Sequence, residues 1–290
     1  MDKKDLKLVS VIITTHNRCD LLTRAIESVL SQTYSKLECI VVDDASEDET
    51  PEVCKRYPVI YIQIPKMESR GGNYARNMGI KTSKGEYCAF LDDDDYWLPT
   101  KIEKQVELIE KKKCELVFCG RRQEIVGKSG ISYKDILPNS QYCGDMKEII
   151  LTNIITVTTC ILARRQALLD VGLFDDNLRF WQEYELTIRL AQRKPFHFVN
   201  EPLAVYRVDE GDKNRLTNQY FTWRDAVKYI HKKHAPLYSE LNMYERLKVQ
   251  YMVWRESMRR CRKVGLRWRF YFYYTLTLIY RVIMKVMKYL

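Results

Sequence analysis

The chain has 290 residues, of which 46% are hydrophobic and 30% are charged. This composition can fill the core of one large domain or two modest ones, so it excludes an intrinsically disordered chain. The net charge of +10 belongs to one region, because residues 245–290 carry twelve Lys or Arg against two Glu and the preceding residues are neutral in sum.

The N-terminal segment MDKKDLKLVSVII has too short an apolar run for a secretory signal peptide. The nine cysteines form no CxxC pattern, and several stand inside apolar runs such as ECIVV and EYCAFL. They indicate small core residues in a reducing compartment rather than a disulfide framework or a zinc site. We therefore expect a cytoplasmic protein.

Apolar, β-rich runs then alternate with helical patterns. Strands are predicted at residues 8–15, 38–44, 59–64, 86–92, 115–120 and 158–163. Leu22, Ala25, Ile26 and Val29 recur at the helical period, and Pro99 stands at the expected first position of a helix over residues 99–113. This alternation predicts an α/β fold with a doubly wound, mostly parallel sheet flanked by helices.

Polar clusters follow three of the predicted strands. They are Thr14-Thr15-His16-Asn17, Asp43-Asp44 and Asp92-Asp93-Asp94-Asp95. Because ligands of such sheets bind beyond the carboxyl ends of the strands, we expect the clusters to meet in one crevice. No GxGxxG or Walker loop follows the first strand, which argues against a standard dinucleotide or P-loop site.

The stretch AFLDDDDYW is either a metal site or a solvated turn. Four adjacent carboxylates repel one another unless a cation neutralises them or water solvates them. A hard divalent cation held by acids favours a ligand that carries phosphates.

Four segments, taken in order, resemble the family 2 inverting glycosyltransferases of GT-A fold, of the type that builds bacterial surface polysaccharides. They are VSVIITTHNR, ESVLSQTYSKLECIVVDDASEDET, GGNYARNMGIKTSKGEYCAFLDDDD and VGLFDDNLRFWQEYELTIRL, and the resemblance extends over residues 7–207. The resemblance implies transfer of a hexosyl or N-acetylhexosaminyl group from a UDP-linked nucleotide sugar. The acceptor would be a hydroxyl of a glycan or lipid-linked glycan, and Mn²⁺ or Mg²⁺ would assist.

The resemblance assigns the nucleoside pocket to the first two strand ends. Thr14, Thr15 and Asn17 would line the pocket for the base and ribose. Asp44 would meet the nucleobase, with Asp43 as its supporting neighbour.

The same resemblance assigns the donor's ribose and phosphates to two further motifs. In ARNMG, Arg76 would face the nucleotide. In the acidic motif, Asp92 would point toward the ribose with Asp93 beside it, Asp94 would hold the metal, and Asp95 would be accessory or solvated.

Inverting transfer needs a base that takes the proton of the acceptor hydroxyl as it attacks the anomeric carbon. By the resemblance, FWQEYELTIRL places Glu183 at that position and Gln182 where the family often has a Glu. Glu185, two residues further on, is the competing candidate.

Each motif also has a purely structural interpretation. Asp43 and Asp44 could open a turn, Glu183 could stabilise a helix start through the dipole, and Arg76 could form a local ion pair. The four histidines show no metal-ligand spacing with cysteines or acids.

We expect the catalytic domain to span residues 1–210 and a basic, aromatic helical extension to span residues 211–290. The extension holds eleven consecutive uncharged residues, 270–280, followed by Arg281, Lys285 and Lys288 at helical spacing. Eleven residues are too few to cross a bilayer, so we predict a helix at the inner face of the cell membrane. The alternative is a helix that packs on protein.

Two other functions compete with catalysis. One is a sugar-nucleotide-binding module without activity. The other is a nucleic-acid-binding protein that uses the basic segment, although the acidic crevice of the neutral region argues against nucleic acid as a partner.

Overall fold

The computed structural model describes residues 6–211 and 219–287, and the chain divides into two compact units. Unit 1 consists of Met1–Met146, Ile155–Leu178 and Gln182–Gly211. Unit 2 consists of Lys147–Ile154, Arg179–Trp181 and Asp212–Leu290. Two short segments of unit 2 therefore lie, in sequence, between the segments of unit 1.

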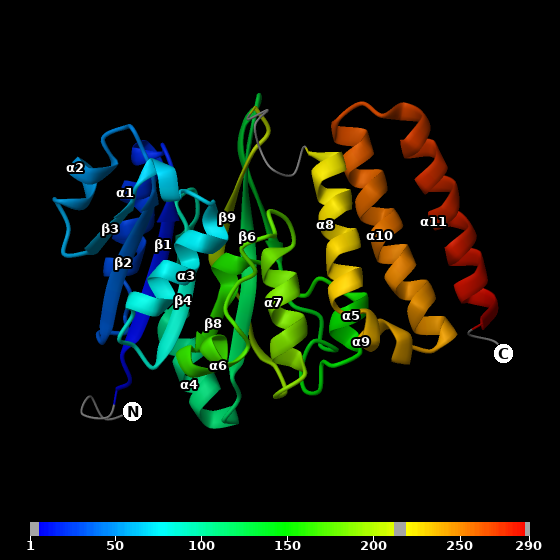
Figure 1. The fold of residues 1–290 in the computed structure, drawn as a ribbon, viewed down its shortest axis with the longest axis horizontal. Coiled ribbons are helices and arrows are strands. Elements are labelled where there is room, and N and C mark those ends of the chain that lie inside the picture. Colours follow the sequence, from blue (N-terminus) through cyan, green and yellow to red (C-terminus); the bar gives the residue numbers. More distant parts are fainter. Residues whose placement is uncertain (1–5, 212–218, 288–290) are drawn as a thin grey trace. The chain divides into compact units, whose positions relative to one another are not determined.

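Unit 1 contains one sheet with the strand order β3-β2-β1-β4-β8-β6-β9-β5, and β7 pairs with β6 (Figure 1). The strands are β1 (Val9–Thr15), β2 (Leu37–Asp44), β3 (Ile60–Ile64), β4 (Tyr87–Asp92), β5 (Tyr96–Trp97), β6 (Leu116–Gly127), β7 (Gly130–Ile136), β8 (Ile161–Arg164) and β9 (His197–Asp209). Strands β1 to β4 pair in parallel, as do β6 and β9, whereas β8 runs antiparallel to both β4 and β6. The predicted α/β fold class is confirmed.

Helices cover both faces of this sheet. They are α1 (Cys19–Leu30), α2 (Thr50–Cys54), α3 (Gly72–Thr82), α4 (Lys101–Lys112), α6 (Arg165–Asp170) and α7 (Gln182–Ala191), with 3-10 turns at Lys66–Glu68 and Thr158–Cys160. Val11 and Ile13 of β1 share one buried cluster with residues of α1 and α4. On the other face, α3 approaches β1 so closely that a Cβ on Gly79 would lie 2.5 Å from a methyl carbon of Ile12.

Two sequence predictions were wrong in detail. Pro99 is not the first helical residue, because Thr100 is the N-cap and the Pro99 carbonyl accepts a hydrogen bond of 2.9 Å from the Thr33 amide. The strand predicted at residues 158–163 begins only at Ile161, because Thr158–Cys160 forms a 3-10 turn.

Unit 2 is helical. It contains α5 (Ile149–Thr152), α8 (Tyr220–Lys233), α9 (Ala235–Glu240), α10 (Met243–Lys263) and α11 (Arg267–Met287). A capping box starts α10, since Asn242 and Glu245 exchange side-chain to backbone hydrogen bonds of 3.0 Å. The rings of Trp181 and Trp223 pack edge to face at 5.4 Å.

Helix α11 has two different faces. Tyr273, Thr277 and Tyr280 are buried, and the Tyr280 ring stacks on Tyr251 of α10 at 4.1 Å. The opposite face forms an exposed stripe at helical spacing, with Trp268, Tyr271, Phe272, Leu278, Ile279, Val282 and Ile283 all exposed. Of the predicted basic residues beyond this stripe, Lys288 lies outside the described residues, as does the side chain of Lys285.

Among the described helices, none combines the length and the apolar character that crossing a membrane requires.

Candidate active site

The three predicted polar clusters meet at one edge of the sheet. Strands β1, β2 and β4 are parallel neighbours, so their carboxyl ends lie together. In the register, Thr15 is opposite Asp43 and Thr14 is opposite Asp92. Strand pairing therefore brings the three polar clusters together at the carboxyl edge of the sheet.

Asn17 ties the first two clusters to each other. Its amide donates to the Ser46 hydroxyl at 2.8 Å, and its side-chain oxygen accepts from the Glu47 amide at 2.7 Å. Asn17 and Ala45 both have positive φ, 52° and 64°, which turns the chain sharply after each strand. His16 joins the same contact, with Nδ1 at 2.6 Å from the Asp44 carbonyl oxygen.

The two acids of β2 have different surroundings. Asp43 is fully buried and accepts hydrogen bonds from the Ser46 amide at 2.9 Å and the Tyr61 hydroxyl at 2.7 Å. Asp44 accepts one from the Gly71 amide at 2.9 Å through Oδ2. Its buried Oδ1 has no hydrogen-bond partner in the part of the chain that the structure describes. A bound N–H donor would satisfy this oxygen.

A hollow of about 310 Å³ follows the same strand ends. It is lined by Ala45, Ser46 and Glu47 after β2 and by residues 63–66 at the end of β3. Its size and its position beyond the carboxyl ends suit a small ligand or part of one.

The four acids at the carboxyl end of β4 differ in burial. The side chain of Asp92 is 32% exposed and that of Asp94 is 27% exposed, whereas Asp93 and Asp95 are buried. Burial raises the pKa of Asp93 to about 6, an effect that the nearby Arg18 guanidinium opposes. Asp95 accepts a hydrogen bond of 2.9 Å from the Arg207 amide, and burial raises the pKa of its carboxyl above the ordinary range. The expectation that Asp95 could be solvated was wrong.

Arg76 links the acidic loop to the start of α7. Its Nη2 lies 2.5 Å from Asp92 Oδ1, and its Nη1 donates to Gln182 Oε1 at 2.8 Å. The guanidinium lies 5.7 Å from the centre of the Phe174 ring. Since the arginine is buried and engaged by two site elements, it holds the loop and the helix together.

The two candidate bases on α7 are clearly distinguished. Glu183 is partly exposed, and burial raises the pKa of its carboxyl, with Arg76 opposing and Asp92 assisting the shift. Glu185 is fully buried and forms a two-pronged ion pair with Arg189, with contacts of 2.9 and 2.6 Å. Glu185 therefore stabilises α7 against the preceding loop, whereas Glu183 is the less buried of the two residues.

Sequence reasoning missed a set of basic residues that support the acidic loop. Arg18 reaches Asp93 at 3.1 Å and Asp94 at 3.2 Å. Arg24 donates to the Asp94 carbonyl at 3.0 Å and pairs with the buried Glu124 at 3.0 Å. Arg18 directly follows THN and could have been noticed, but Arg24 and Glu124 are 100 residues apart and carry no local signal.

The carboxylates at this edge fit a divalent cation that is coordinated partly by the protein and partly by a bound ligand. Within residues 6–211 and 219–287, no three side chains of the metal-binding types gather as a stand-alone site. Mg²⁺ and Mn²⁺ bound with phosphates need only one or two carboxylates, the other positions being phosphate oxygens and water. Asp94 is a partly exposed carboxylate at the strand-end edge, and its contact with Arg18 indicates that it accepts a cation.

Comparison with known proteins gives one consistent result. The family model described as Glycosyl transferase family 2 matches residues 10–172. An uncharacterised glycosyltransferase of Rickettsia typhi is 31% identical over 78% of this chain and 73% of its own length. The Escherichia coli protein WfaP, named a UDP-Glc:alpha-D-GlcNAc-diphosphoundecaprenol beta-1,3-glucosyltransferase, is 41% identical over 37% of this chain and 43% of its own length.

Solved structures share the fold. S. aureus TarS 1–349 in complex with UDP-GlcNAc superposes with a TM-score of 0.60 at 16% identity, over 95% of this chain and 89% of that one. The mannosyltransferase PcManGT of Pyrobaculum calidifontis, with GDP-Man and Mn²⁺, gives a TM-score of 0.56 at 16% identity, over 95% and 84% of the two chains.

Proposed function

Since this chain belongs to glycosyl transferase family 2, we propose that it inverts the anomeric centre of a UDP-linked sugar on transfer to a hydroxyl of a lipid-linked glycan. The name of WfaP, a glucosyltransferase whose acceptor sugar is linked to diphosphoundecaprenol, supports the lipid-linked acceptor, and surface polysaccharide synthesis is the setting we propose. The observation that carries the proposal is the Arg76 link, because it ties the acidic loop to the helix that presents Glu183.

The pocket residues would divide the donor between them. Thr14, Thr15 and Asn17 stand at the end of β1, and the free oxygen of Asp44 would accept a hydrogen bond from the nucleobase. Asp92, with Asp93 behind it, would meet the ribose. Glu183 would take the proton of the acceptor hydroxyl while the acceptor oxygen attacks the anomeric carbon and the nucleoside diphosphate departs.

Asp94 would hold Mn²⁺ or Mg²⁺ together with the diphosphate. A bound cation neutralises the charge that grows on the leaving group. In this structure the positive charge beside Asp93 and Asp94 is the guanidinium of Arg18. Metal affinity is therefore expected to depend on the nucleotide, because the protein supplies too few ligands alone.

A panel of nucleotide sugars tests the proposal. UDP-glucose, UDP-galactose, UDP-N-acetylglucosamine and GDP-mannose are each offered with Mn²⁺ or EDTA, and release of the nucleoside diphosphate is measured. We expect Mn²⁺-dependent release from a UDP sugar, increased by a polyprenyl-diphosphate-linked glycan. Donor binding without turnover would identify a binding module, and binding of nucleic acid instead of donor would refute the proposal.

The metal assignment predicts the behaviour of Asp94→Ala. This variant should lose Mn²⁺-dependent donor binding and turnover but fold normally, since a partly exposed carboxylate supports no core. Asp135→Ala is the control, because Asp135 pairs with Arg122 on an exposed hairpin. Full activity of Asp94→Ala in EDTA would contradict the assignment.

The enzyme would work at the inner face of the cell membrane, attached through α11. The exposed stripe supports this, because rings and aliphatic side chains at helical spacing suit the boundary between lipid and water. The variant Ile279→Ser/Val282→Ser should lose co-sedimentation with anionic vesicles, while Met243→Ser, at another exposed apolar side chain of unit 2, should not. Equal binding by all three proteins would make α11 a packing helix only.

A further inference from the structure

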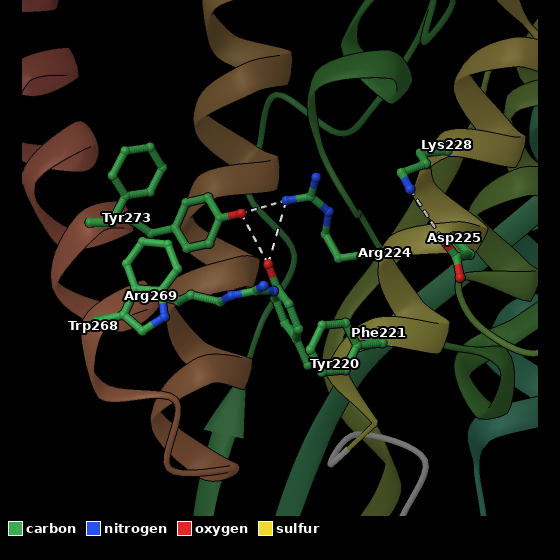
Figure 2. Close-up of a pocket in the computed structure, with 9 residues that line it drawn as sticks. Tyr220, Phe221, Arg224, Asp225, Lys228, Trp268, Arg269 and Tyr273 are labelled. Carbon is green, nitrogen blue, oxygen red and sulfur yellow. Dashed lines mark hydrogen bonds and ion pairs between the residues drawn. The ribbon is translucent and has the colours of Figure 1, made fainter.

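Unit 2 contains a pocket that the glycosyl transfer reaction does not use. It has a volume of about 330 Å³ and is formed by α8 and α11 (Figure 2). Tyr220 and Phe221 of α8 and Trp268 and Phe272 of α11 supply aromatic walls. Every lining residue belongs to these two helices, so the pocket lies within one unit.

The pocket holds two arginines that face no carboxylate. Arg224 donates to the hydroxyl groups of Tyr220 and Tyr273, which are neutral acceptors (Figure 2). Arg269 lies over aromatic rings, 5.1 Å from the centre of Phe221 and 5.6 Å from that of Trp268. Among the described residues neither arginine forms an ion pair with an acid.

The remaining charges of the pocket cancel each other. Lys228 lies one turn after Arg224 on α8, and its Nζ is 3.2 Å from Asp225 Oδ1. The two arginines therefore leave a net positive charge in a hollow with aromatic walls.

The helix ends add to this positive potential. Tyr220 and Phe221 lie in the first turn of α8, and Trp268 and Arg269 lie in the first turn of α11. Gln219, the N-cap of α8, makes no side-chain capping hydrogen bond. The first turns of both helices therefore lie beside the pocket, and their positive dipole ends add to the positive potential near it.

We propose that this pocket binds the phosphate of an anionic membrane lipid. The inference deepens the proposed attachment of α11 to the membrane and rests on it. Guanidinium and tyrosine hydroxyl donors match phosphate oxygens. Trp268 and Phe272 belong both to the pocket and to the exposed stripe, so a lipid headgroup in the pocket would leave its chains beside Leu278 and Ile279.

A lipid explains the pocket better than a soluble anion does. Inorganic phosphate would gain nothing from the aromatic walls or from the apolar stripe that continues along α11. Nucleic acid would need cations spread along a surface, whereas the two unpaired arginines converge on one hollow.

Vesicle binding at physiological ionic strength tests the inference, because general charge attraction is then largely screened. Partition into phosphatidylcholine vesicles with and without phosphatidylglycerol is compared for the full chain, Arg224→Gln, Arg269→Gln and Arg281→Gln. Arg281 is the matched control, since it is an exposed arginine of α11 outside the pocket. We expect partition to fall about tenfold for either pocket variant and by less than about threefold for the control.

Two further measurements test the tyrosine hydroxyl and the need for a lipid chain. Tyr273→Phe keeps the ring but removes one hydroxyl, so it should weaken binding of short-chain phosphatidylglycerol in solution. Its melting temperature should fall only by the amount that one lost buried hydrogen bond explains, so the chain stays folded in the assay. Inorganic phosphate is offered in parallel and should bind much more weakly than the lipid.

The outcomes separate this inference from the proposals it rests on. Equal losses for Arg281→Gln and the pocket variants, or equal affinity for inorganic phosphate, would overturn the pocket assignment. Binding that fails only in Ile279→Ser/Val282→Ser would leave the membrane attachment standing without the pocket. UDP binding, measured on every variant, reports separately on the site in unit 1.

Discussion

Glu183 and Glu185 lie two residues apart on α7, yet their surroundings give them different chemistry. Glu185 is completely buried and held in a structural ion pair with the Arg189 guanidinium. Glu183 stays partly exposed, and its position one residue after Gln182 places it next to the Arg76 link. The two glutamates therefore differ in burial and in partners, and we propose Glu183 rather than Glu185 as the base.

Substitution of each glutamate tests this division. Glu183→Gln should bind donor normally but lose transfer by about a hundredfold or more, the usual contribution of a positioned base. Glu185→Gln should lower stability by about 3 kcal/mol, since the half-buried Arg189 loses its carboxylate partner. Steady-state kinetics and thermal melts of both variants decide the matter, and a fully active Glu183→Gln beside a folded but inactive Glu185→Gln would exchange the roles.

The raised pKa of Glu183 predicts the acidic side of the pH profile. A base acts only when deprotonated, so transfer should fall as the pH drops through the folded-state pKa. Because burial raises the pKa of Glu183, that fall should begin above the ordinary value of 4.5. The dependence of kcat/KM on pH measures it, and a fall centred below 4.5 would contradict the assignment.

At the scale of single elements, the first turn of α4 contains a buried lysine whose charge destabilises the folded protein. Lys101 is completely buried, with its ammonium 3.8 Å from the centre of the Trp97 ring and 2.8 Å from Gln105 Oε1. Burial lowers the pKa of Lys101 from 10.5 to about 8. A cation at a helix N-terminus is also opposed by the dipole.

Lys101→Met should therefore stabilise the protein at pH 7. The pKa difference corresponds to about 3 kcal/mol, reduced to about 1–2 kcal/mol by the lost hydrogen bond and ring contact. Between pH 8 and 10.5 the unfolded chain binds more protons, so wild-type stability should rise with pH and the gain should shrink. Urea unfolding at pH 7 and pH 10 measures the stability gain. Lys111→Met, at an exposed position of the same helix, is the control. A Lys101→Met variant that is less stable than wild type at pH 7 would contradict the prediction.

Elements defined by nearby residues could be predicted from the sequence, whereas contacts between distant residues could not. Strands β1 to β4 and helix α1 were predictable, because their apolar periodicity is written in consecutive residues. The acids at the strand ends were predictable for the same reason. The pairing of β6 with β9, residues 117–126 with 197–209, left no local trace, and neither did the contact of Arg24 with Glu124.

At the scale of the whole molecule, the chain order and the folded units do not coincide. Unit 2 takes Lys147–Ile154 and Arg179–Trp181 from the region that otherwise forms unit 1. Within unit 2, Arg260 of α10 lies 5.4 Å from the centre of the Phe180 ring and 5.0 Å from that of Trp223. Ile150 of α5 is fully buried, and α5 packs against α10. These segments have no other apolar surface of unit 2 to cover them once α8 to α11 are gone.

A chain cut after Gly211 should therefore fold poorly, although it retains the strands and every proposed site residue. Removing α8 to α11 would uncover Ile150, Leu151, Phe180 and Trp181, each of which contributes about 1.5–3 kcal/mol when buried. We expect this truncated chain to bind a hydrophobic dye and to melt well below the full-length protein. A chain cut after Leu266 is the control, since it loses α11 but keeps α8 and α10 over these four residues, and it should melt closer to the full-length protein. A chain ending at Gly211 that binds no dye and melts with the full-length protein would show that the inserted segments need no cover, and would make unit 2 an appendage.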